Sequence, residues 1–395
     1  MTARSDDDRT LAILLAGGQG SRLHELTAAD CKPALHMGEG RRIVDFTMAN
    51  AVASGIDRML VATQYRPASL EDHLPRRWGH AFRNLSLRHG PTVTGTAAGY
   101  VGTAAAVAAN MAEIDASGAE EVLILAGDHV YDMDFAAMIA QHRETGAAVT
   151  VAVEAVPLRE ASAFGVLHTD DGGRVLSFLE KPALPPHMPG DPSRALASMG
   201  IYVFSWDWLR AALLMDAMEP ESSHDFGHDI LPAAVSMGAA FAHRRPAGAY
   251  WRDVGTLDAF RQTALDLRDA HSPCRLPDRI ARADLDPGHD GWVGHSVTIS
   301  GISLMAPRST GRWTLLDETV ILPGARVETG ARLTRAIVAP GTVIPSDLTV
   351  GEDPAEDARW FRVSPGGTTL ITQDMLARRD ARALVRPAAA MVVTR

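Results

Sequence analysis

Continuous apolar runs of strand length recur along the first part of the chain and are separated by helical patterns. Leu11–Leu15, Met59–Thr63 and Glu121–Ala126 are such runs, and they are typical of strands that are buried on both faces of a parallel sheet. Between the first two runs, apolar residues follow helical spacing over Ile43–Gly55. This order predicts an α/β fold with a mostly parallel sheet and helices on both faces.

The same pattern continues through the middle of the chain. Ala148–Val156 and Ile201–Phe204 are further predicted strands. Between them, Asp170–Gly173 is a strong turn signal that predicts a hairpin of Val166–His168 and Val175–Phe178. A helical pattern then begins near Leu257 and ends near Arg268.

The hydrophobic period changes in the last third of the chain. Apolar residues then recur every six positions, with one slip to five, at Ile321, Val327, Leu333, Val338, Ile344 and Val350. Hexapeptide repetition with Pro-Gly turns predicts a short left-handed parallel β-helix. We therefore expect an α/β domain over residues 1–270, a linker over 271–292, a left-handed β-helix domain over 293–376 and a loose C-terminal tail over 377–395.

Composition excludes several classes of function. The net charge of −10 argues against non-specific nucleic-acid binding, and no apolar run reaches the roughly 18 residues that a membrane span needs. Two cysteines cannot build a disulfide framework, and the polar first ten residues are unlike a signal peptide. We therefore expect a cytoplasmic protein without nucleic-acid or membrane partners.

Lysine is almost absent from the chain. Of the 38 basic residues only Lys32 and Lys181 are lysines, and both stand before a proline in short motifs. Because a compact ammonium and a planar guanidinium are not interchangeable at a tight site, we interpret both positions as places where only lysine works.

A glycine-rich turn follows the first predicted strand. Gly17, Gly18 and Gly20 let the backbone approach a ligand closely, and amides in such a loop form an anion cradle to which Arg22 adds a charged fork. The turn lacks the Gly-Lys-Ser/Thr ending of a Walker A loop, and Arg22 lies near the place of the third glycine of a dinucleotide motif. A plain structural turn explains the glycines equally well.

Two aspartates follow predicted strands or turns in positions suited to a cation. Asp128 comes directly after Glu121–Ala126, and Asp253 lies at a turn before the helix near Leu257. A carboxylate at the carboxyl end of a central parallel strand is placed to hold a cation over nucleotide phosphates. Capping of the next helix by Asp128 is the alternative, and we expect His129 to pack or hydrogen-bond rather than to bind metal.

Taken together, the motifs resemble the bacterial ADP-glucose pyrophosphorylase (glucose-1-phosphate adenylyltransferase) family. The resembling segments run in order from residue 11 to about 376. They are LLAGGQGSRL, KPALH, RRIVDF, TQY, YVGTAAAV, ILAGDHVY, EASAFGV, EKP, LASMGIYVF, SSHDFGHDI, YWRDVGT and VIPSDLTVGEDPAEDARWF. The resemblance implies a Rossmann-like nucleotidyltransferase domain, a β-helix domain and a homotetramer. It also implies a Mg²⁺-dependent reaction of ATP with glucose 1-phosphate that gives ADP-glucose and pyrophosphate.

The resemblance also implies roles for particular residues. The catalytic group would be Arg22, Lys32, Asp128 and Asp253, with Asp128 and Asp253 holding Mg²⁺. The ATP-binding residues would be Leu15, Ala16, Gly17, Gly18, Gly20, Gln64, Gly102 and Thr103. The glucose 1-phosphate-binding residues would be Tyr100, Gly165, Glu180, Lys181 and Ser198. In this family Glu180 would bind sugar hydroxyls and Lys181 the phosphate.

Several departures from the family pattern lie in its effector site. Val101 and Pro340 stand where the family usually has arginine, and Asp30 adds a negative charge beside Lys32. Only His36 and Arg42 remain as candidate effector residues, together with the neighbouring Arg41. We therefore expect a weakened or altered response to anionic effectors such as fructose 1,6-bisphosphate.

Other functions remain open at this stage. A pyrophosphorylase for another nucleoside triphosphate or sugar phosphate shares most of the motifs. A non-catalytic regulatory subunit would explain the changed effector residues, but the intact Arg22, Lys32, Asp128, Lys181 and Asp253 argue against it. An acyltransferase fits the hexapeptide repeat, but the repeat has too few coils.

Overall fold

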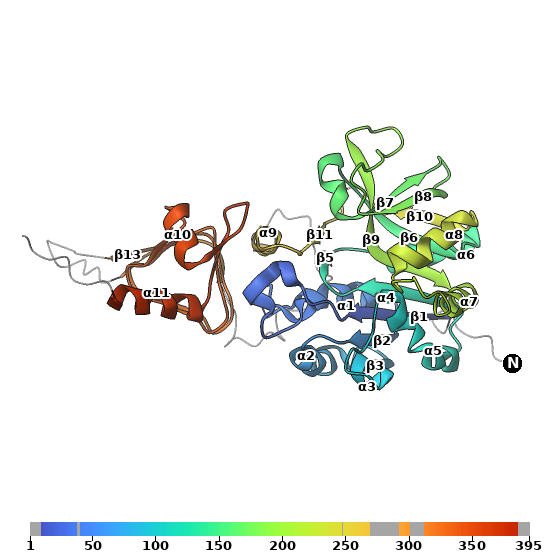
Figure 1. The fold of residues 1–395 in the computed structure, drawn as a ribbon, viewed down its shortest axis with the longest axis horizontal. Coiled ribbons are helices and arrows are strands. Elements are labelled where there is room, and N and C mark those ends of the chain that lie inside the picture. Colours follow the sequence, from blue (N-terminus) through green and yellow to red (C-terminus); the bar gives the residue numbers. More distant parts are fainter. Residues whose placement is uncertain (1–8, 38–39, 247, 269–291, 301–311, 386–395) are drawn as a thin grey trace, which may run out of the picture.

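The computed structural model describes residues 9–37, 40–246, 248–268, 292–300 and 312–385 (Figure 1). The chain forms a large α/β domain followed by a smaller C-terminal domain. The expected linker, residues 271–292, lies outside the described residues except for its last position. Among the described residues, no helix combines the length and the apolar character needed to cross a membrane.

A nine-stranded sheet forms the centre of the α/β domain. Its main path runs β10-β6-β9-β4-β1-β2-β3, with β7 beside β9 and β8 beside β7. These strands are β1 (Thr10–Ala16), β2 (Arg58–Thr63), β3 (Asn84–His89), β4 (Glu121–Ala126), β6 (Val149–Pro157), β7 (Gly165–Thr169), β8 (Val175–Glu180), β9 (Arg194–Ser205) and β10 (Ala240–Arg244). The neighbours β1, β2, β3 and β4 pair in parallel, whereas β9 is antiparallel to β4 and β6. The predicted α/β fold with a mostly parallel sheet is confirmed.

Helices cover both faces of this sheet. The longer helices are α1 (Ile43–Ala53), α2 (Ala68–Trp78), α6 (Phe135–Thr145), α7 (Trp206–Asp216) and α9 (Leu257–Arg268). The shorter ones are α3 (Gly90–Thr94), α4 (Thr103–Ala108), α5 (Met111–Ser117), α8 (Leu231–Ser236), the 3₁₀ segments η2 (Ser21–Thr27), η3 (Lys32–Ala34) and η4 (Leu158–Ala163), and the π-helical η5 (Phe226–Ile230). A small antiparallel pair joins β5 (His129–Tyr131) to β11 (Trp251–Asp253).

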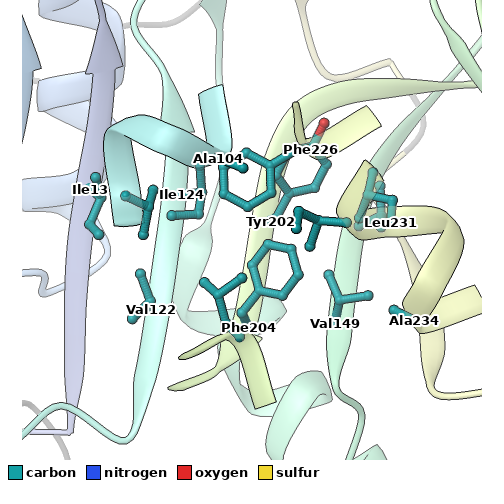
Figure 2. Close-up of a cluster of buried hydrophobic side chains, with 14 of the residues drawn as sticks. Ile13, Ala104, Val122, Ile124, Val149, Tyr202, Phe204, Phe226, Leu231 and Ala234 are labelled. Atoms are coloured by element: carbon teal, nitrogen blue, oxygen red, sulfur yellow. The ribbon is translucent and has the colours of Figure 1, made fainter. Parts of the chain in front are cut away.

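Alternate residues of the central strands enter two different cores. Ile13, Val122 and Ile124 pack with α4, α5, α7 and α8 on one face (Figure 2), whereas Leu14 and Leu125 pack with α1, α2 and α6 on the other. Because successive strand residues point to opposite faces, burial on both faces requires an uninterrupted apolar run. This is why Leu11–Leu15 and Glu121–Ala126 show no polar alternation.

The C-terminal domain is built from stacked short strands. These are β12 (Trp292–Ser300), β13 (Arg312–Ile321), β14 (Arg326–Val327), β15 (Arg332–Thr334), β16 (Ala336–Val338), β17 (Val343–Ile344), β18 (Thr349–Val350), β19 (Arg362–Val363) and β20 (Thr369–Ile371). The hexapeptide residues pair in parallel as Ile321 with Val338, Val327 with Ile344 and Leu333 with Val350. Each pair is separated by one full coil of chain, so the slip in the period brings like residues into register. The strands are those of the predicted β-helix.

The predicted loose tail is wrong for its first part. Helix α10 (Pro354–Trp360) precedes β19, and helix α11 (Gln373–Val385) includes residues 377–385. Met375 and Leu376 of α11 are buried against Val350, Phe361 and Ile371 of the β-helix. The Arg/Ala-rich composition that suggested a tail also favours helix, and two apolar residues suffice to dock it. Residues 386–395 lie outside the described residues.

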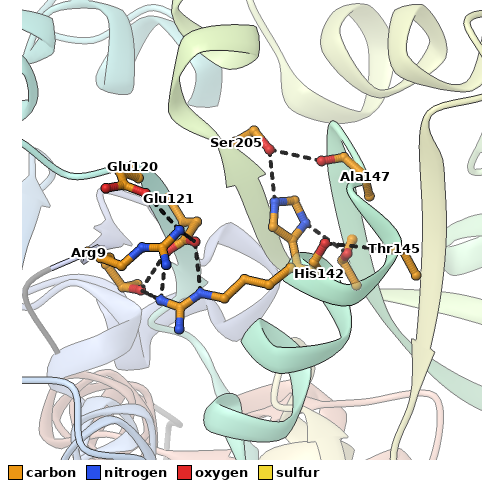
Figure 3. Close-up of polar contacts among 10 residues, drawn as sticks. Arg9, Glu120, Glu121, His142, Thr145, Ala147 and Ser205 are labelled. Carbon is orange, nitrogen blue, oxygen red and sulfur yellow. Dashed lines mark hydrogen bonds and ion pairs between the residues drawn. The ribbon is translucent and has the colours of Figure 1, made fainter. Parts of the chain in front are cut away.

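The burial of one histidine, His142, predicts that the α/β domain loses stability at acid pH. His142 of α6 lies between the Thr150 and Ser205 hydroxyls at 2.9 and 3.1 Å (Figure 3). Burial lowers the pKa of His142 to about 4, from 6.5. Unfolding therefore takes up a proton below about pH 6.5, so stability falls as the pH falls from about 6.5 to about 4. Burial and Arg42 also lower the pKa of His36 to about 4, which adds to the same slope.

We expect the variant His142→Gln to reduce this slope in urea unfolding measured from pH 7 to pH 4. The exposed His80 provides the matched control, since His80→Gln should leave the slope as it is in the wild type. An identical slope in the His142→Gln protein would contradict the assignment.

Candidate active site

A cavity of about 470 Å³ opens at the carboxyl ends of the parallel strands. This edge of an open α/β sheet is where ligands bind. Nine of the residues predicted from the family resemblance line it: Leu15, Gly17, Gly18, Gln64, Tyr100, Gly102, Thr103, Asp128 and Glu180. The nucleotide-side and sugar-side predictions therefore meet in one cavity, although they are spread over 166 positions of sequence.

In the glycine loop, Gly17 and Gly20 are crowded by neighbouring side chains, whereas Gly18 is open. Gly20 has φ +62°, and a Cβ atom there would lie 2.9 Å from the Lys32 Cβ, so a side chain would be strained and crowded. At Gly17 a Cβ would lie 3.2 Å from the Gln64 Cβ. By contrast, no atom of the described residues lies within 4 Å of a Cβ built on Gly18. The loop therefore presents bare backbone to the cavity at Gly18.

Gln64 holds the loop that faces the glycines. Its side-chain amide donates to the Tyr100 carbonyl at 3.0 Å and accepts from the Tyr100 backbone N–H at 2.5 Å. Two residues later, Gly102 has φ +101°, and a Cβ there would lie 2.3 Å from the carbonyl oxygen of His224. The Tyr100–Thr103 segment is thus fixed between β2 and the segment before η5.

Three charged side chains converge at the edge of this cavity. The Lys32 Nζ donates to Asp128 Oδ2 at 2.9 Å and to Asp253 Oδ1 at 2.8 Å. The Lys32 side chain is 5% exposed and that of Asp128 is 40% exposed. Burial by itself raises the pKa of the Asp128 carboxyl, but the Lys32 ammonium and His129 outweigh it and hold that pKa well below its usual range. Burial likewise lowers the pKa of Lys32, and the two carboxylates outweigh it and raise that pKa.

The carboxylates are brought together by the β5–β11 pair. Asp128 ends the turn before β5, and Asp253 is the last residue of β11, paired with His129. The His129 ring packs edge-on against Trp251 at 5.6 Å, as expected for a packing histidine. However, its Nε2 also faces Asp128 Oδ1 and Asp253 Oδ1 at 3.6 and 3.7 Å. In the described part of the chain, Asp128, His129 and Asp253 form a group with possible metal-ligand atoms within 4.8 Å of one another.

Arg22 approaches this group from the glycine loop. Its Nη2 lies 3.5 Å from Asp253 Oδ2, and its side chain is 63% exposed. Arg22 and Asp253 line a second cavity of about 600 Å³ that also contains Trp251 and Gly255. A Cβ at Gly255 would lie 2.6 Å from Arg22 Nη2, so this glycine permits the close approach.

Glu180 and Lys181 lie at the end of the β7–β8 hairpin. The Lys181 Nζ donates to Glu180 Oε1 at 2.8 Å, and the Lys181 side chain is 65% exposed. A Cβ at Gly165 would lie 2.5 Å from the Phe178 ring and 2.9 Å from Glu180 Oε2, so this glycine leaves room for both side chains. Ser198 of β9 is buried, and its Oγ lies 3.4 Å from the Tyr202 hydroxyl.

Among the lining residues that sequence reasoning missed are Tyr202, Asp225, Phe226 and Gly227, which lie on the side of the cavity with Glu180. Asp225 caps η5 by accepting from the Gly227 and His228 N–H groups, and its other oxygen accepts from the Thr103 hydroxyl at 2.9 Å. Phe226 stacks on Phe204 at 5.4 Å in the core (Figure 2). Asp225, Phe226 and Gly227 belong to the motif SSHDFG, which supported the family resemblance but was not assigned to the site.

Some predicted residues lie apart from the cavity. Ala16, Gly20, Lys32, Gly165, Lys181 and Ser198 are neighbours of lining residues rather than lining residues themselves. Among the described residues, His36 and Arg42 line neither of the two cavities. Arg42 donates to the carbonyl and the hydroxyl of Ser69 at 2.9 and 3.1 Å, and His36 is largely buried.

Comparison with known proteins agrees with this arrangement. Residues 11–270 match the nucleotidyl transferase family, and residues 289–371 match a GlmU-like C-terminal hexapeptide family. The chain is 46% identical to the glucose-1-phosphate adenylyltransferase of Jannaschia sp. (94% of this chain, 97% of the relative). It is 44% identical to the enzyme of the same name from Mesorhizobium japonicum (93% and 96%). The chain therefore belongs to the nucleotidyl transferase family and, within it, to the group of glucose-1-phosphate adenylyltransferases.

Proposed function

We propose that this protein transfers the adenylyl group of ATP to α-D-glucose 1-phosphate, giving ADP-glucose and pyrophosphate for glycogen or α-glucan synthesis. One observation carries the proposal. A cavity with a bare glycine loop at one side and the Glu180 carboxylate at the other has a pair of aspartates at its edge. Relatives that match almost the whole chain are named for this activity.

The donor set suits Mg²⁺. Asp128 and Asp253 already share one cation, the Lys32 ammonium, and two carboxylates with phosphate oxygens and water make a normal magnesium shell. When bound, Mg²⁺ would neutralise charge on the phosphates and template their geometry.

The remaining chemistry needs positioning rather than a protein nucleophile. In this proposal the Gly17–Gly20 backbone cradles the triphosphate and Arg22 neutralises the leaving pyrophosphate. Lys32 leaves the carboxylates to bind phosphate, Glu180 binds sugar hydroxyls and Lys181 binds the sugar phosphate. The attacking phosphate oxygen is already anionic, so no general base is required.

The direct test measures pyrophosphate release by the purified protein with ATP, glucose 1-phosphate and Mg²⁺. Competition with other nucleoside triphosphates and sugar phosphates separates this function from a pyrophosphorylase of other specificity. Absence of turnover with every pair of substrates would favour the regulatory-subunit alternative. From the family resemblance we also propose a cytoplasmic homotetramer, which light scattering tests against the 42.2 kDa mass of one chain.

Lys181→Arg should raise the apparent KM for glucose 1-phosphate far more than that for ATP. The Lys181 ammonium reaches Glu180 from a backbone with φ +44°, and the longer, planar guanidinium does not fit the same place. Steady-state kinetics with each substrate varied in turn measure the effect. Equal changes in both KM values would place Lys181 outside the sugar-phosphate site.

Activation by fructose 1,6-bisphosphate should be weak or altered. Each charged hydrogen bond to an anion typically contributes about 1.5–3 kcal/mol, and here Val101 and Pro340 stand in place of arginines. Arg42 is engaged with Ser69 and His36 is only partly exposed, so neither is presented openly. A severalfold rise of activity at micromolar effector would contradict this expectation.

A further inference from the structure

Apart from the Arg261–Glu318 ion pair at 2.9 Å, the 362–368 segment of the C-terminal domain contacts the α/β domain at two polar anchor points. The first is Glu25 of η2, whose carboxylate accepts from Arg362 Nε and Nη2 at 2.7 and 2.6 Å. A two-pronged arginine–carboxylate contact fixes orientation as well as distance. Hydrogen bonding by Arg362 lowers the pKa of Glu25, so the pair is charged at neutral pH.

The second anchor is Asp258, in the first turn of α9. Its carboxylate accepts from the hydroxyls of Ser364 and Thr368, each at 2.6 Å, and from the Gly366 N–H at 3.1 Å. A Cβ at Gly366 would lie 2.6 Å from this carboxylate, so the backbone is in direct contact with it. Thr368 also accepts from Arg261 Nε at 3.0 Å, which ties the anchor to the buried face of α9. Among the described residues, the side-chain and backbone donors to the Asp258 carboxylate come from the 362–368 segment.

Each anchor lies a few residues from the catalytic group. Glu25 follows Arg22 by three residues in η2, on the other side of a backbone kink at His24. Asp258 follows Asp253 across the turn at Gly255, where Arg22 makes its close approach. One surface segment of the C-terminal domain thus fixes the two chain segments that bring Arg22 and Asp253 within 3.5 Å of each other.

The Arg362–Glu25 anchor is poorly suited to a purely stabilising role. The Arg362 and Glu25 side chains are 41% and 32% exposed, and exposed ion pairs contribute little to stability. The domains are instead joined by an apolar core in which Leu257 and Phe260 pack with Val320, Ile337 and Leu370. Apolar packing therefore holds the two domains together, and the polar anchors fix their relative position.

We propose that the 362–368 segment positions Arg22 and Asp253, with Glu25 and Asp258 as positioning residues for the adenylyl transfer. The inference rests on the proposed function for its kinetic test. It is specific to the metal and phosphate side of the cavity. Within the described part of the chain, the 362–368 segment makes its polar contacts to the α/β domain with Glu25, Asp258 and Arg261 and not with the sugar-side residues.

The test compares Arg362→Gln with a matched control, Arg332→Gln. Arg332 forms a similarly exposed pair with Glu352 at 2.6 Å inside the C-terminal domain. A small misplacement of catalytic groups costs rate steeply, so kcat of Arg362→Gln should fall roughly tenfold. Its KM for glucose 1-phosphate and its Tm should match those of the control. The double variant Glu25→Arg/Arg362→Glu should recover most of kcat.

Two results would overturn the proposal. One is a kcat for Arg362→Gln equal to that of Arg332→Gln, and the other is a loss of kcat that only follows a loss of folded protein. Asp258→Asn tests the second anchor with the same readouts.

A readout without turnover separates this inference from the proposed function. Titration with Mn²⁺ alone, followed by electron paramagnetic resonance, reports on the Asp128–Asp253 pair. Weaker Mn²⁺ binding by Arg362→Gln than by Arg332→Gln supports the positioning role even if the wild type transfers no adenylyl group. Equal Mn²⁺ affinities in an inactive protein would reject both.

Discussion

Asp128→Asn should lower turnover by about two orders of magnitude or more. Asparagine keeps the shape of the side chain but removes the charge, and loss of one preorganised electrostatic contact at a reacting centre typically costs about 10²–10³ in kcat. Asp128 has the required place, because it lies at the cavity edge and shares the Lys32 ammonium with Asp253. Pyrophosphate release measured over a Mg²⁺ titration gives both kcat and the metal requirement.

The nearby Asp132 provides a control for this change. It lies four residues further along, beyond β5, and its backbone N–H bonds to Tyr250. Asp132→Asn should retain the metal dependence of the wild type. Near-normal Mg²⁺-dependent turnover in a folded Asp128→Asn protein would contradict the assignment of the metal site.

Lys32→Met should reduce kcat by about a hundredfold or more and should also destabilise the metal-free protein. The ammonium is the shared partner of two carboxylates, and removing it leaves them facing each other without the cation that bridges them. Breaking a buried ion pair costs about 3–5 kcal/mol, and since Asp128 is 40% exposed we expect about 3 kcal/mol. Urea unfolding in the presence of a chelator measures this loss.

Magnesium distinguishes the two effects of this change. A cation that binds the folded protein restores stability by mass action, so saturating Mg²⁺ should recover much of the unfolding free energy of Lys32→Met but not its kcat. Wild-type protein should gain less from the same Mg²⁺, because there the metal must compete with the ammonium. A Lys32→Met protein as stable as wild type in chelator would show that the contacts are weak.

The features that sequence predicted well are those set by local pattern. Buried parallel strands must be continuously apolar, and this identified β1, β2 and β4. The β-helix was equally predictable, because the length of one coil appears directly in the sequence spacing of Ile321, Val338 and their neighbours. Motif resemblance predicted nine of the residues that line the cavity.

The features that sequence did not predict depend on long-range contacts. Asp225 and Tyr202 reach the cavity only because η5 packs on β9, far from the glycine loop. The Lys32 motif gave no sign that its ammonium lies between two aspartates that are 96 and 221 positions away. The helix α11 was missed because its Arg/Ala-rich sequence was judged by composition, although Met375 and Leu376 dock it.

The way β9 enters the sheet has an evolutionary consequence. Its second half pairs with β4 and β6 at the centre, whereas its first half pairs with β6 on one side and with β7 of the β7–β8 hairpin on the other. Within the described strands, Gly165 and Glu180 therefore lie on a hairpin off the main path of the sheet. The glycine loop, by contrast, follows the central strand β1. Mutations that reshape the hairpin leave the ladder of β1, β2 and β4 untouched. If the hairpin binds the acceptor and the glycine loop the phosphates, as proposed above, lineages with this architecture can exchange the acceptor by diversifying one hairpin and keep the phosphate-binding half unchanged.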